Sequence, residues 1–338
     1  MKEILQKLYE HHKLTREEAK GVLTEIAQGA FPAVQIASFI TVFQMRGIGL
    51  AELEGFRDAL LELCVPLDVL GQETVDIVGT GGDHKDTFNI STLAAVVVAG
   101  AGYKVTKHGN YGASSAVGSS NVLQTLGYQF TNDGDTLRRQ LDEANLCFLH
   151  APLFHPALKE VAAVRRELGI RTFFNMLGPL VNPVQPTHQL YGTSSLELSR
   201  MYHYIMQQSG RRFAIVYALD GYDEISLTGR FKVQTNEGEL VLEPEDLKQP
   251  RLSPPDLYCG GTAEDAAKIF RNVLQNEATP AQKAVVTVNA GLAIKTMKPE
   301  RTFFEGVEEA RESLESGRAL NNFKKLINGG EGGEGLGG

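Results

Sequence analysis

Residues 75–127 read VDIVGTGGDHKDTFNISTLAAVVVAGAGYKVTKHGNYGASSAVGSSNVLQTLG, and this stretch decides the fold. Its apolar start, at 75–78, predicts a buried strand that ends in a glycine loop, GTGGD, at 79–83. Glycine adopts positive φ and lets the backbone approach a ligand, so three glycines in four positions predict a loop that wraps a bound group. The residues alone leave open a glycine-rich turn of an α/β domain that binds nothing.

The next segments continue the order of strand, loop and helix. NIST at 89–92 offers three capping side chains to an apolar helix at 93–98, whose free N–H groups favour an anion. A second strand, at 103–106, is expected to deliver the residues KHGN of 107–110 into a loop of small residues. This order predicts an anion site at the carboxyl ends of parallel strands.

The glycine loop matches neither of the two common nucleotide motifs. The Rossmann pattern G-x-G-x-x-G fails because His84 occupies the third glycine position, and no Gly-Lys-Ser/Thr closes a Walker loop. The loop also carries Asp83 and Asp86, whose carboxylates would repel a bare phosphate. We therefore expect a bridging divalent cation or a contact to sugar hydroxyls, and an oxygen-rich site of this kind suits Mg²⁺.

A second acidic feature follows an apolar strand predicted at 213–217. Asp223 and Glu224 are neighbours, and paired carboxylates at a strand end can hold a hard cation. A solvated pair on the surface is the other interpretation, and the two residues by themselves favour it.

The chain divides by pattern into a helical part and an α/β part. Amphipathic helices predict a small N-terminal helical domain over 1–66. Alternating strands and helices predict a large α/β domain with a mostly parallel central sheet over 73–328. A hairpin is expected at 231–242, and the Gly/Glu tail 329–338 is expected to be flexible.

Composition restricts the class of protein. The 338 residues carry a formal net charge of −8, which argues against general nucleic-acid affinity. Three cysteines without a C-x-x-C spacing indicate reduced thiols, and the apolar run at 93–101 is too short to cross a bilayer. The N-terminus lacks the apolar run of a signal peptide, so we expect a cytoplasmic protein without membrane contact.

Five blocks of the chain, taken together, carry a resemblance. They are GTGGD (79–83), NIST (89–92), KHGN with the following SS and GS (107–120), HPALKEVAAVRRELGIRTFFNMLGPLVNP (155–183) and GYDEIS (221–226). In this order they resemble the anthranilate phosphoribosyltransferases of the tryptophan pathway, over the whole chain except its last few residues. That family has the nucleoside phosphorylase/phosphoribosyltransferase type of fold.

The resemblance implies an activity. The 5-phosphoribosyl group of 5-phosphoribosyl 1-diphosphate (PRPP) would pass to the amino nitrogen of anthranilate, which gives N-(5-phosphoribosyl)anthranilate and diphosphate. Two Mg²⁺ ions are implied, and no catalytic general base, since an aromatic amine is already neutral at pH 7. A homodimer is also implied, formed by the helical domain together with helices near 155–185, and so is association with a glutamine amidotransferase or anthranilate synthase subunit.

The resemblance also assigns site residues by position. Those expected to bind PRPP are Gly79, Gly82, Asp83, Thr87, Asn89, Ile90, Ser91, Thr92, Lys107, His108, Gly109, Asn110, Tyr111, Gly112, Ala113, Ser114, Ser115 and Ser119. Those expected to bind anthranilate are Gly79, Asn110 and Arg165, and those expected to hold metal are Ser91, Asp223 and Glu224. One ion is expected at Ser91 and Glu224, and the second at Asp223 and Glu224.

Individual roles follow from the side chains. Lys107 is expected to act as a point charge against phosphate, and Arg165 to hold the anthranilate carboxylate with its planar guanidinium. A solvated lysine and a surface arginine are the plainer interpretations, and Arg166 is expected to be such a surface residue. For His108 we expect a neutral packing or hydrogen-bonding role, because no cysteine or second histidine stands at ligand spacing.

Three positions depart from the pattern that is common in the family. Tyr111 stands where an arginine often occurs, and Asn121 and Gln124 replace acidic residues. None of these changes removes a residue assigned to metal or anthranilate, so PRPP affinity is the property they affect.

Two other functions share the architecture. A pyrimidine nucleoside phosphorylase would use inorganic phosphate in the same loops, and a non-catalytic relative would bind nucleic acid. The acidic balance of the chain weighs against the second.

Overall fold

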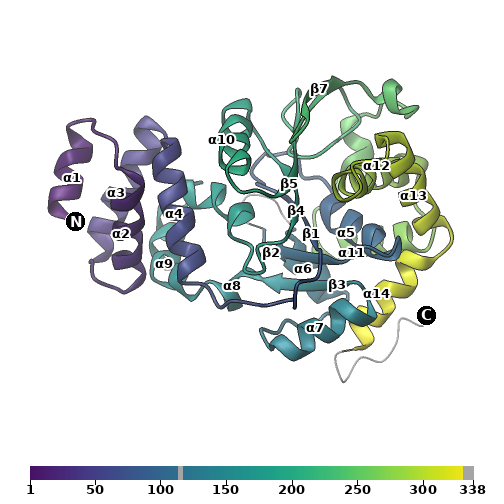
Figure 1. Cartoon of the computed structure of the whole chain (residues 1–338), viewed down its shortest axis with the longest axis horizontal. Coiled ribbons are helices and arrows are strands. Elements are labelled where there is room, and N and C mark those ends of the chain that lie inside the picture. Colours follow the sequence, from purple (N-terminus) through teal and green to yellow (C-terminus); the bar gives the residue numbers. More distant parts are fainter. Residues whose placement is uncertain (113–116, 330–338) are drawn as a thin grey trace. The chain divides into compact units, whose positions relative to one another are not determined.

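The computed structural model describes residues 1–112 and 117–329 (Figure 1). The predicted site residues Ala113, Ser114 and Ser115 therefore lie outside the described residues, as does the predicted tail from residue 330 onward.

The chain forms two compact units. The helical unit consists of Met1–Leu67 and Ala151–Gln185, and the α/β unit consists of Asp68–His150 and the chain from Pro186 onward. The helical unit is thus built from two separate stretches of sequence.

Short helices make up the helical unit. They are α1 (Lys2–Tyr9), α2 (Arg16–Ala27), α3 (Ala33–Arg46), α4 (Leu50–Glu62), α8 (Ala151–Phe154) and α9 (Lys159–Leu168), with 3-10 turns η1 (Pro156–Leu158), η2 (Phe173–Met176) and η3 (Gly178–Val181). Phe173 of the second stretch packs among three phenylalanines of the first, with ring centroids 4.7 Å from Phe56, 5.0 Å from Phe43 and 6.2 Å from Phe39. Aromatic packing therefore joins the two stretches.

The α/β unit is built on one seven-stranded sheet. Its strands are β1 (Val75–Gly79), β2 (Val105–Gly109), β3 (Leu146–His150), β4 (His188–Gly192), β5 (Arg212–Ala218), β6 (Phe231–Thr235) and β7 (Gly238–Leu242). The order is β3-β2-β1-β4-β5-β6-β7. The first five strands run parallel, and β6 and β7 add an antiparallel hairpin. The predicted fold class and the predicted hairpin are confirmed.

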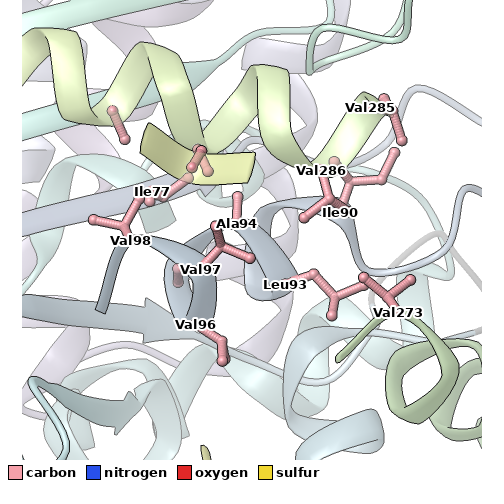
Figure 2. Close-up of a cluster of buried hydrophobic side chains, with 14 of the residues drawn as sticks. Ile77, Ile90, Leu93, Ala94, Val96, Val97, Val98, Val273, Val285 and Val286 are labelled. Carbon is pink, nitrogen blue, oxygen red and sulfur yellow. The ribbon is translucent and has the colours of Figure 1, made fainter. Parts of the chain in front are cut away.

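Helices cover both faces of this sheet. They are α5 (Ile90–Gly100), α6 (Ser119–Thr125), α7 (Gly134–Glu143), α10 (Leu196–Gln207), α11 (Ala263–Leu274), α12 (Pro280–Met297), α13 (Phe303–Glu315) and α14 (Arg318–Asn328), with 3-10 turns η4 (Pro244–Leu247) and η5 (Pro254–Leu257). α10 lies on one face, and α5 and α12 lie on the other (Figure 1). Side chains of α5 and α12 meet in the main apolar core, where Ile90 and Val286 are both fully buried (Figure 2).

The sheet has a switch point between β1 and β4. From β1 the chain moves outward to β2 and β3, and from β4 it moves in the opposite direction to β5. The loops that leave β1 and β4 therefore lead in opposite directions, and the carboxyl ends of strands at such a switch point are where ligands of open α/β sheets bind.

Two boundaries differ from the sequence-based expectation. β2 begins at Val105 and continues through Lys107 and His108, which were expected in a loop. The expected strand ended at residue 106 because Lys107 and His108 are polar. In the structure both side chains are buried within the strand, with exposed fractions of 2% and 3%. The helix after the glycine loop begins at Ile90, not at Leu93. The Asn89 side chain does not cap it: Oδ1 accepts no hydrogen bond from a described residue, and Nδ2 donates to Val117 O (3.3 Å).

Candidate active site at the switch point of the sheet

The glycine loop after β1 is held against the acidic segment that follows β5. Gly81 and Gly82 have φ of 65° and 74°, a region that glycine enters without strain. The turn they make directs Gly81 N toward Asp223, whose Oδ2 accepts its hydrogen bond at 2.6 Å. Residues 142 positions apart in sequence are thereby brought together, so the two acidic features of the sequence form one site.

Glu224 lies at the centre of this site. Its Oε1 accepts a hydrogen bond from Thr87 Oγ1 at 2.8 Å. Burial raises the pKa of Glu224 well above its usual value, and the neighbouring charges of Asp223 and Asp83 raise it further. Asp83 adds a buried Oδ2 that has no hydrogen-bond partner. The negative charges of Asp223 and Asp83 act on Glu224, and a cation near Glu224 would relieve this repulsion.

Lys107 reaches the same cluster from β2. Its ammonium group donates to Ile77 O at 2.5 Å, inside the sheet. Burial lowers the pKa of Lys107, and the charges of Asp76 and Glu224 oppose that shift. The lysine is therefore a buried positive charge on which the carboxylates of Asp76 and Glu224 act, and its expected contact with phosphate stays a prediction.

The start of α5 forms the second side of the site. Ser91 and Thr92 stand in its first turn, where backbone N–H groups lack partners within the helix. Thr92 Oγ1 and Asn89 Oδ1 are buried without a hydrogen-bond partner. The hydroxyl of Thr87, four residues before Ser91, donates to Glu224, so the acidic segment contacts the chain just ahead of this helix. The Thr92 hydroxyl and the free N–H groups of the helix N-terminus can donate to an anionic ligand, whereas Asn89 Oδ1 can only accept a hydrogen bond.

The segment after β2 contains the three departures from the family pattern, and each has a partner. Asn121 Oδ1 accepts hydrogen bonds from Gly112 N (3.0 Å) and Gly118 N (2.9 Å), so it ties together the two ends of the loop. Tyr111 Oη donates to Gln124 Oε1 at 3.3 Å. Asn121 and Gln124 thus serve as hydrogen-bond acceptors for the backbone and side chain of this segment.

The remaining predicted residues of this segment lie in the last part of β2 and directly after it, or at the start of α6. Gly109 closes β2, and an added Cβ there would stand 2.3 Å from Ser119 Oγ and 2.6 Å from the Phe148 ring, so a side chain at this position would displace both. Asn110 O accepts a hydrogen bond from Ser119 Oγ at 3.3 Å. The buried His108 has its backbone N–H bonded to Asp76 Oδ1 at 3.2 Å.

Arg165 belongs to the helical unit. Its guanidinium lies 5.2 Å from the centre of the Phe174 ring, and Nη2 is 3.5 Å from Asn175 Oδ1. Burial lowers the pKa of Arg165. Among the described residues, no carboxylate pairs with this partly buried cation, whereas the neighbouring Arg166 is exposed. An unpaired guanidinium of this kind is suited to a carboxylate ligand.

Three residues of the site escaped sequence reasoning. Gly192 ends β4 beside Gly79, Asp76 lies in β1, and Asn289 lies on α12 against the residue after Glu224. Of the three, only Gly192 could have been noticed in the sequence, as a glycine at the end of a predicted strand. Asp76 and Asn289 stand within a strand and a helix, where nothing distinguishes them.

Two negative findings concern the residues that the structure describes. No group of three or more histidine, cysteine, aspartate or glutamate side chains within 1–112 and 117–329 is arranged to enclose a metal ion. No helix in the same part of the chain is long and apolar enough to cross a membrane. Cys64, Cys147 and Cys259 are free thiols.

Two family models match the chain. The model described as "Glycosyl transferase family, helical bundle domain" matches residues 2–64, and the one described as "Glycosyl transferase family, a/b domain" matches residues 71–320. Together they match a helical segment followed by an α/β segment, in that order along the chain.

Curated relatives match over nearly full length. The anthranilate phosphoribosyltransferase of Cytophaga hutchinsonii is 58% identical over 97% of this chain and 100% of the relative. That of Bacteroides thetaiotaomicron is 57% identical over 97% of this chain and 98% of the relative.

Solved structures of the same kind superpose on the chain. The anthranilate phosphoribosyltransferase of Thermus thermophilus has a TM-score of 0.89 at 34% identity, with 96% of this chain and 98% of that chain covered. The Saccharomyces cerevisiae enzyme in complex with PRPP and Mg has a TM-score of 0.89 at 27% identity, with 96% of each chain covered. With its fold, its domain matches and these relatives, the chain belongs to the anthranilate phosphoribosyltransferase family.

Proposed function

We propose that this chain transfers the 5-phosphoribosyl group from PRPP to the amino nitrogen of anthranilate, as a step of tryptophan biosynthesis. The observation that carries the proposal is the meeting of the glycine loop with Asp223 and Glu224, through Gly81 N and Thr87 Oγ1. This contact supports a site that combines these carboxylates with the N-terminus of α5, which begins three residues after Thr87 and is suited to phosphate. Homologous yeast structures are in complex with PRPP and Mg and with 4-fluoroanthranilate.

The acidic cluster fits Mg²⁺. Asp223, Glu224 and Ser91 supply oxygen atoms only, and the buried Oδ2 of Asp83 has no partner. Mg²⁺ takes oxygen ligands and keeps positions for water and substrate phosphates, so few protein ligands suffice. When bound, the metal supplies positive charge that stabilises the departing diphosphate. We assign two ions, one to Ser91 and Glu224 and one to Asp223 and Glu224.

The phosphoribosyl substrate would lie over the glycine loop and the first turn of α5. Backbone N–H groups at Ser91 and Thr92 provide directed donors to phosphate, and Thr92 Oγ1 has no other hydrogen-bond partner. Lys107 contributes charge from beneath the cluster. The chain thereby holds the ribose so that its anomeric carbon faces the incoming amine.

Anthranilate would be oriented by its carboxylate. Arg165 offers a guanidinium without a carboxylate partner among the described residues, and Gly79 and Asn110 are proposed as further contacts. The aromatic amine is neutral at pH 7 and attacks without prior deprotonation. We therefore assign no catalytic base, and the contribution of the chain is to position two substrates and stabilise the leaving charge.

We also propose that the protein is a cytoplasmic homodimer, joined through the helical unit. Large apolar side chains of this unit are exposed, among them Met45 (83%), Val34 (71%), Tyr9 (56%) and Ile170 (52%). They support an interface on this unit to the extent that they gather into one apolar patch. We further propose that the protein associates with an anthranilate synthase subunit.

The decisive experiment follows anthranilate fluorescence. Purified protein is mixed with PRPP, Mg²⁺ and anthranilate, and fluorescence is expected to fall as the phosphoribosyl product forms. In parallel reactions that contain EDTA or lack PRPP, the fluorescence should stay constant. Phosphorolysis of uridine or thymidine by orthophosphate, together with constant anthranilate fluorescence, would assign the chain to the nucleoside phosphorylases instead.

A further inference from the structure

The carboxylate pair stands on an irregular segment. Residues 222–225 belong to no helix or strand, so no regular hydrogen-bond ladder fixes their backbone. Asp223 and Glu224 nevertheless point toward the glycine loop, where they accept hydrogen bonds from Gly81 N and Thr87 Oγ1. Other contacts must hold this segment in place.

Asn289 provides the first of these contacts. Its side chain, only 5% exposed, accepts a hydrogen bond from Ile225 N at 3.1 Å and donates one to Ile225 O at 2.8 Å. Both backbone polar groups of the residue after Glu224 are therefore paired by one amide, as a neighbouring strand would pair them. The same Nδ2 also donates to Val285 O at 2.8 Å, which fixes the orientation of the amide.

Two glycines provide the second contact, from the strand ends. Gly79 and Gly192 are register partners in β1 and β4. A Cβ on Gly79 would stand 2.3 Å from Asp223 Oδ2, and one on Gly192 would stand 1.5 Å from Asp223 O. Any side chain at Gly192 would displace the backbone of Asp223, so the segment rests directly on the two strand ends.

The helix that carries Asn289 is firmly anchored. α12 begins with a capping box between Thr279 and Gln282, and Val285 and Val286 are fully buried in the main core (Figure 2). Gly291 lets α13 approach closely, since a Cβ there would stand 2.6 Å from Val307 N. Asn289 is thus presented by an element that packs on both sides, which is what a positioning contact requires.

We propose that Asn289 is a positioning residue for the metal-binding carboxylates, acting with Gly192 on the backbone of residues 223–225. This role rests on the proposed function only because it takes Asp223 and Glu224 to be metal ligands. Asn289 sets the path of the chain at Ile225, and Gly192 leaves space for it at Asp223. Neither residue touches the substrates, and both act through the carboxylate pair.

The test measures metal binding directly. Mn²⁺ replaces Mg²⁺, PRPP is present, and electron paramagnetic resonance reports free Mn²⁺ in titrations of the wild-type chain and of Asn289→Leu. Loss of a direct hydrogen-bond partner of a metal ligand typically weakens metal affinity about 10- to 100-fold, and because Asn289 holds the residue next to Glu224, a shift at the lower end of that range, about tenfold, is expected. The anthranilate concentration at half-maximal rate should stay unchanged at saturating metal. Asn289→Asp, which retains the acceptor for Ile225 N, is measured likewise in case the leucine variant does not fold.

Asn322 offers a matched control in the same unit. Its amide donates to Ala99 O (2.9 Å) and Ala144 O (3.1 Å), so it also joins backbone segments, but it makes no contact with residues 223–225. Asn322→Leu should lower the thermal midpoint and leave Mn²⁺ affinity at the wild-type value. If both asparagine variants lose thermal stability and keep wild-type Mn²⁺ affinity, Asn289 has only a structural role and the proposal is wrong.

Wild-type turnover separates this proposal from the proposed function. If the wild-type chain forms no product but binds Mn²⁺, and Asn289→Leu weakens that binding, the positioning role stands and the proposed function fails. If product forms and Asn289→Leu binds Mn²⁺ as the wild type does, the function stands and the positioning role fails. A wild-type chain that binds no Mn²⁺ in the presence of PRPP also overturns the positioning role.

Discussion

Two glutamates, one in each unit, are withdrawn from solvent in opposite ways. Glu52 of the helical unit has an exposed fraction of 0%, and its carboxylate receives Arg46 Nη2 (2.6 Å), Arg46 Nη1 (3.0 Å), Leu14 N (2.9 Å) and Gly49 N (2.7 Å). Burial alone would raise the pKa of Glu52, but these donors lower it below its usual value. Among the described residues, Glu224 of the α/β unit has one donor, Thr87, and its pKa is raised.

The difference shows that burial alone does not mark a functional carboxylate. Glu52 is saturated by donors of its own chain, so it fixes the start of α4 and has no capacity for a ligand. Glu224 lies near the charges of Asp223 and Asp83 and, among the described residues, accepts a hydrogen bond from Thr87 alone, so it keeps capacity for a proton or for the cation that we propose. The two cases predict opposite outcomes when the charge is removed.

Removal of the charge in the α/β unit should abolish activity and spare the fold. In the double variant Asp223→Asn, Glu224→Gln, Mg²⁺-dependent turnover should fall at least ~10³-fold, about 4 kcal/mol of transition-state stabilisation. Thermal stability should be equal or higher, because like charges no longer repel. Anthranilate fluorescence measures the first quantity and calorimetry the second. Wild-type turnover in this variant would contradict the metal assignment.

Removal of the charge in the helical unit should lower stability and leave activity unchanged. Glu52→Gln leaves the buried Arg46 guanidinium, 15% exposed as a side chain, without its counter-charge. Breaking a buried pair from one side costs about 3 to 4 kcal/mol of unfolding free energy. Urea unfolding measures the loss, with Glu62→Gln as a control at an exposed ion pair with Lys20. Turnover per folded molecule should stay at the wild-type value, and an unfolding free energy equal to wild type would break the comparison.

A buried histidine of the helical unit should link its stability to pH. Burial lowers the pKa of His155 to about 4 from 6.5, and Nε2 bonds to Val181 O at 2.9 Å. Between these values the unfolded chain binds a proton that the native chain does not, so unfolding free energy falls as pH decreases from 6.5 to 4, by ~3 kcal/mol in all. Urea titrations across this range should show the fall, and His155→Gln should remove most of it. Equal slopes in both proteins would place the titrating group elsewhere.

Arg165 is the exception within the helical unit, since it is a partly buried charge without a carboxylate partner among the described residues. Arg165→Ala should therefore raise the anthranilate concentration at half-maximal rate about thirtyfold, ~2 kcal/mol of binding. The PRPP requirement should stay the same, and Arg166→Ala should match the wild type. Steady-state kinetics with each substrate varied in turn measure the change. An effect on PRPP alone would assign Arg165 to the other substrate.

Local pattern predicted most of the sheet. The apolar runs at 75–78, 146–149 and 213–217 became β1, β3 and β5, since strands buried on both faces are continuous in hydrophobicity. β2 was placed two residues early, because Lys107 and His108 interrupt its run. A lysine is buried in a strand only where acceptors and carboxylates surround it, and no local pattern reports those neighbours.

The candidate site was predicted to the extent that its residues lie in loops with a distinct composition. The glycine loop and the Asp223–Glu224 pair stood out, and the Gly81–Asp223 contact joins them. Gly192 and Asn289 could not be recognised, because a strand-end glycine and a polar residue in a buried helix gain their meaning from Asp223 and Ile225, which are distant in sequence.

The discontinuous make-up of the helical unit affects how the protein emerges from the ribosome. Phe39, Phe43 and Phe56 are synthesised early, but Phe173, the ring that stacks on Phe56, follows only after the first three strands of the sheet have been made. β1 likewise waits for β4 to pair with its second edge. Neither unit completes its interior during the first half of translation, so nascent chains display unpaired aromatic surface and an open strand edge, the features that chaperones recognise.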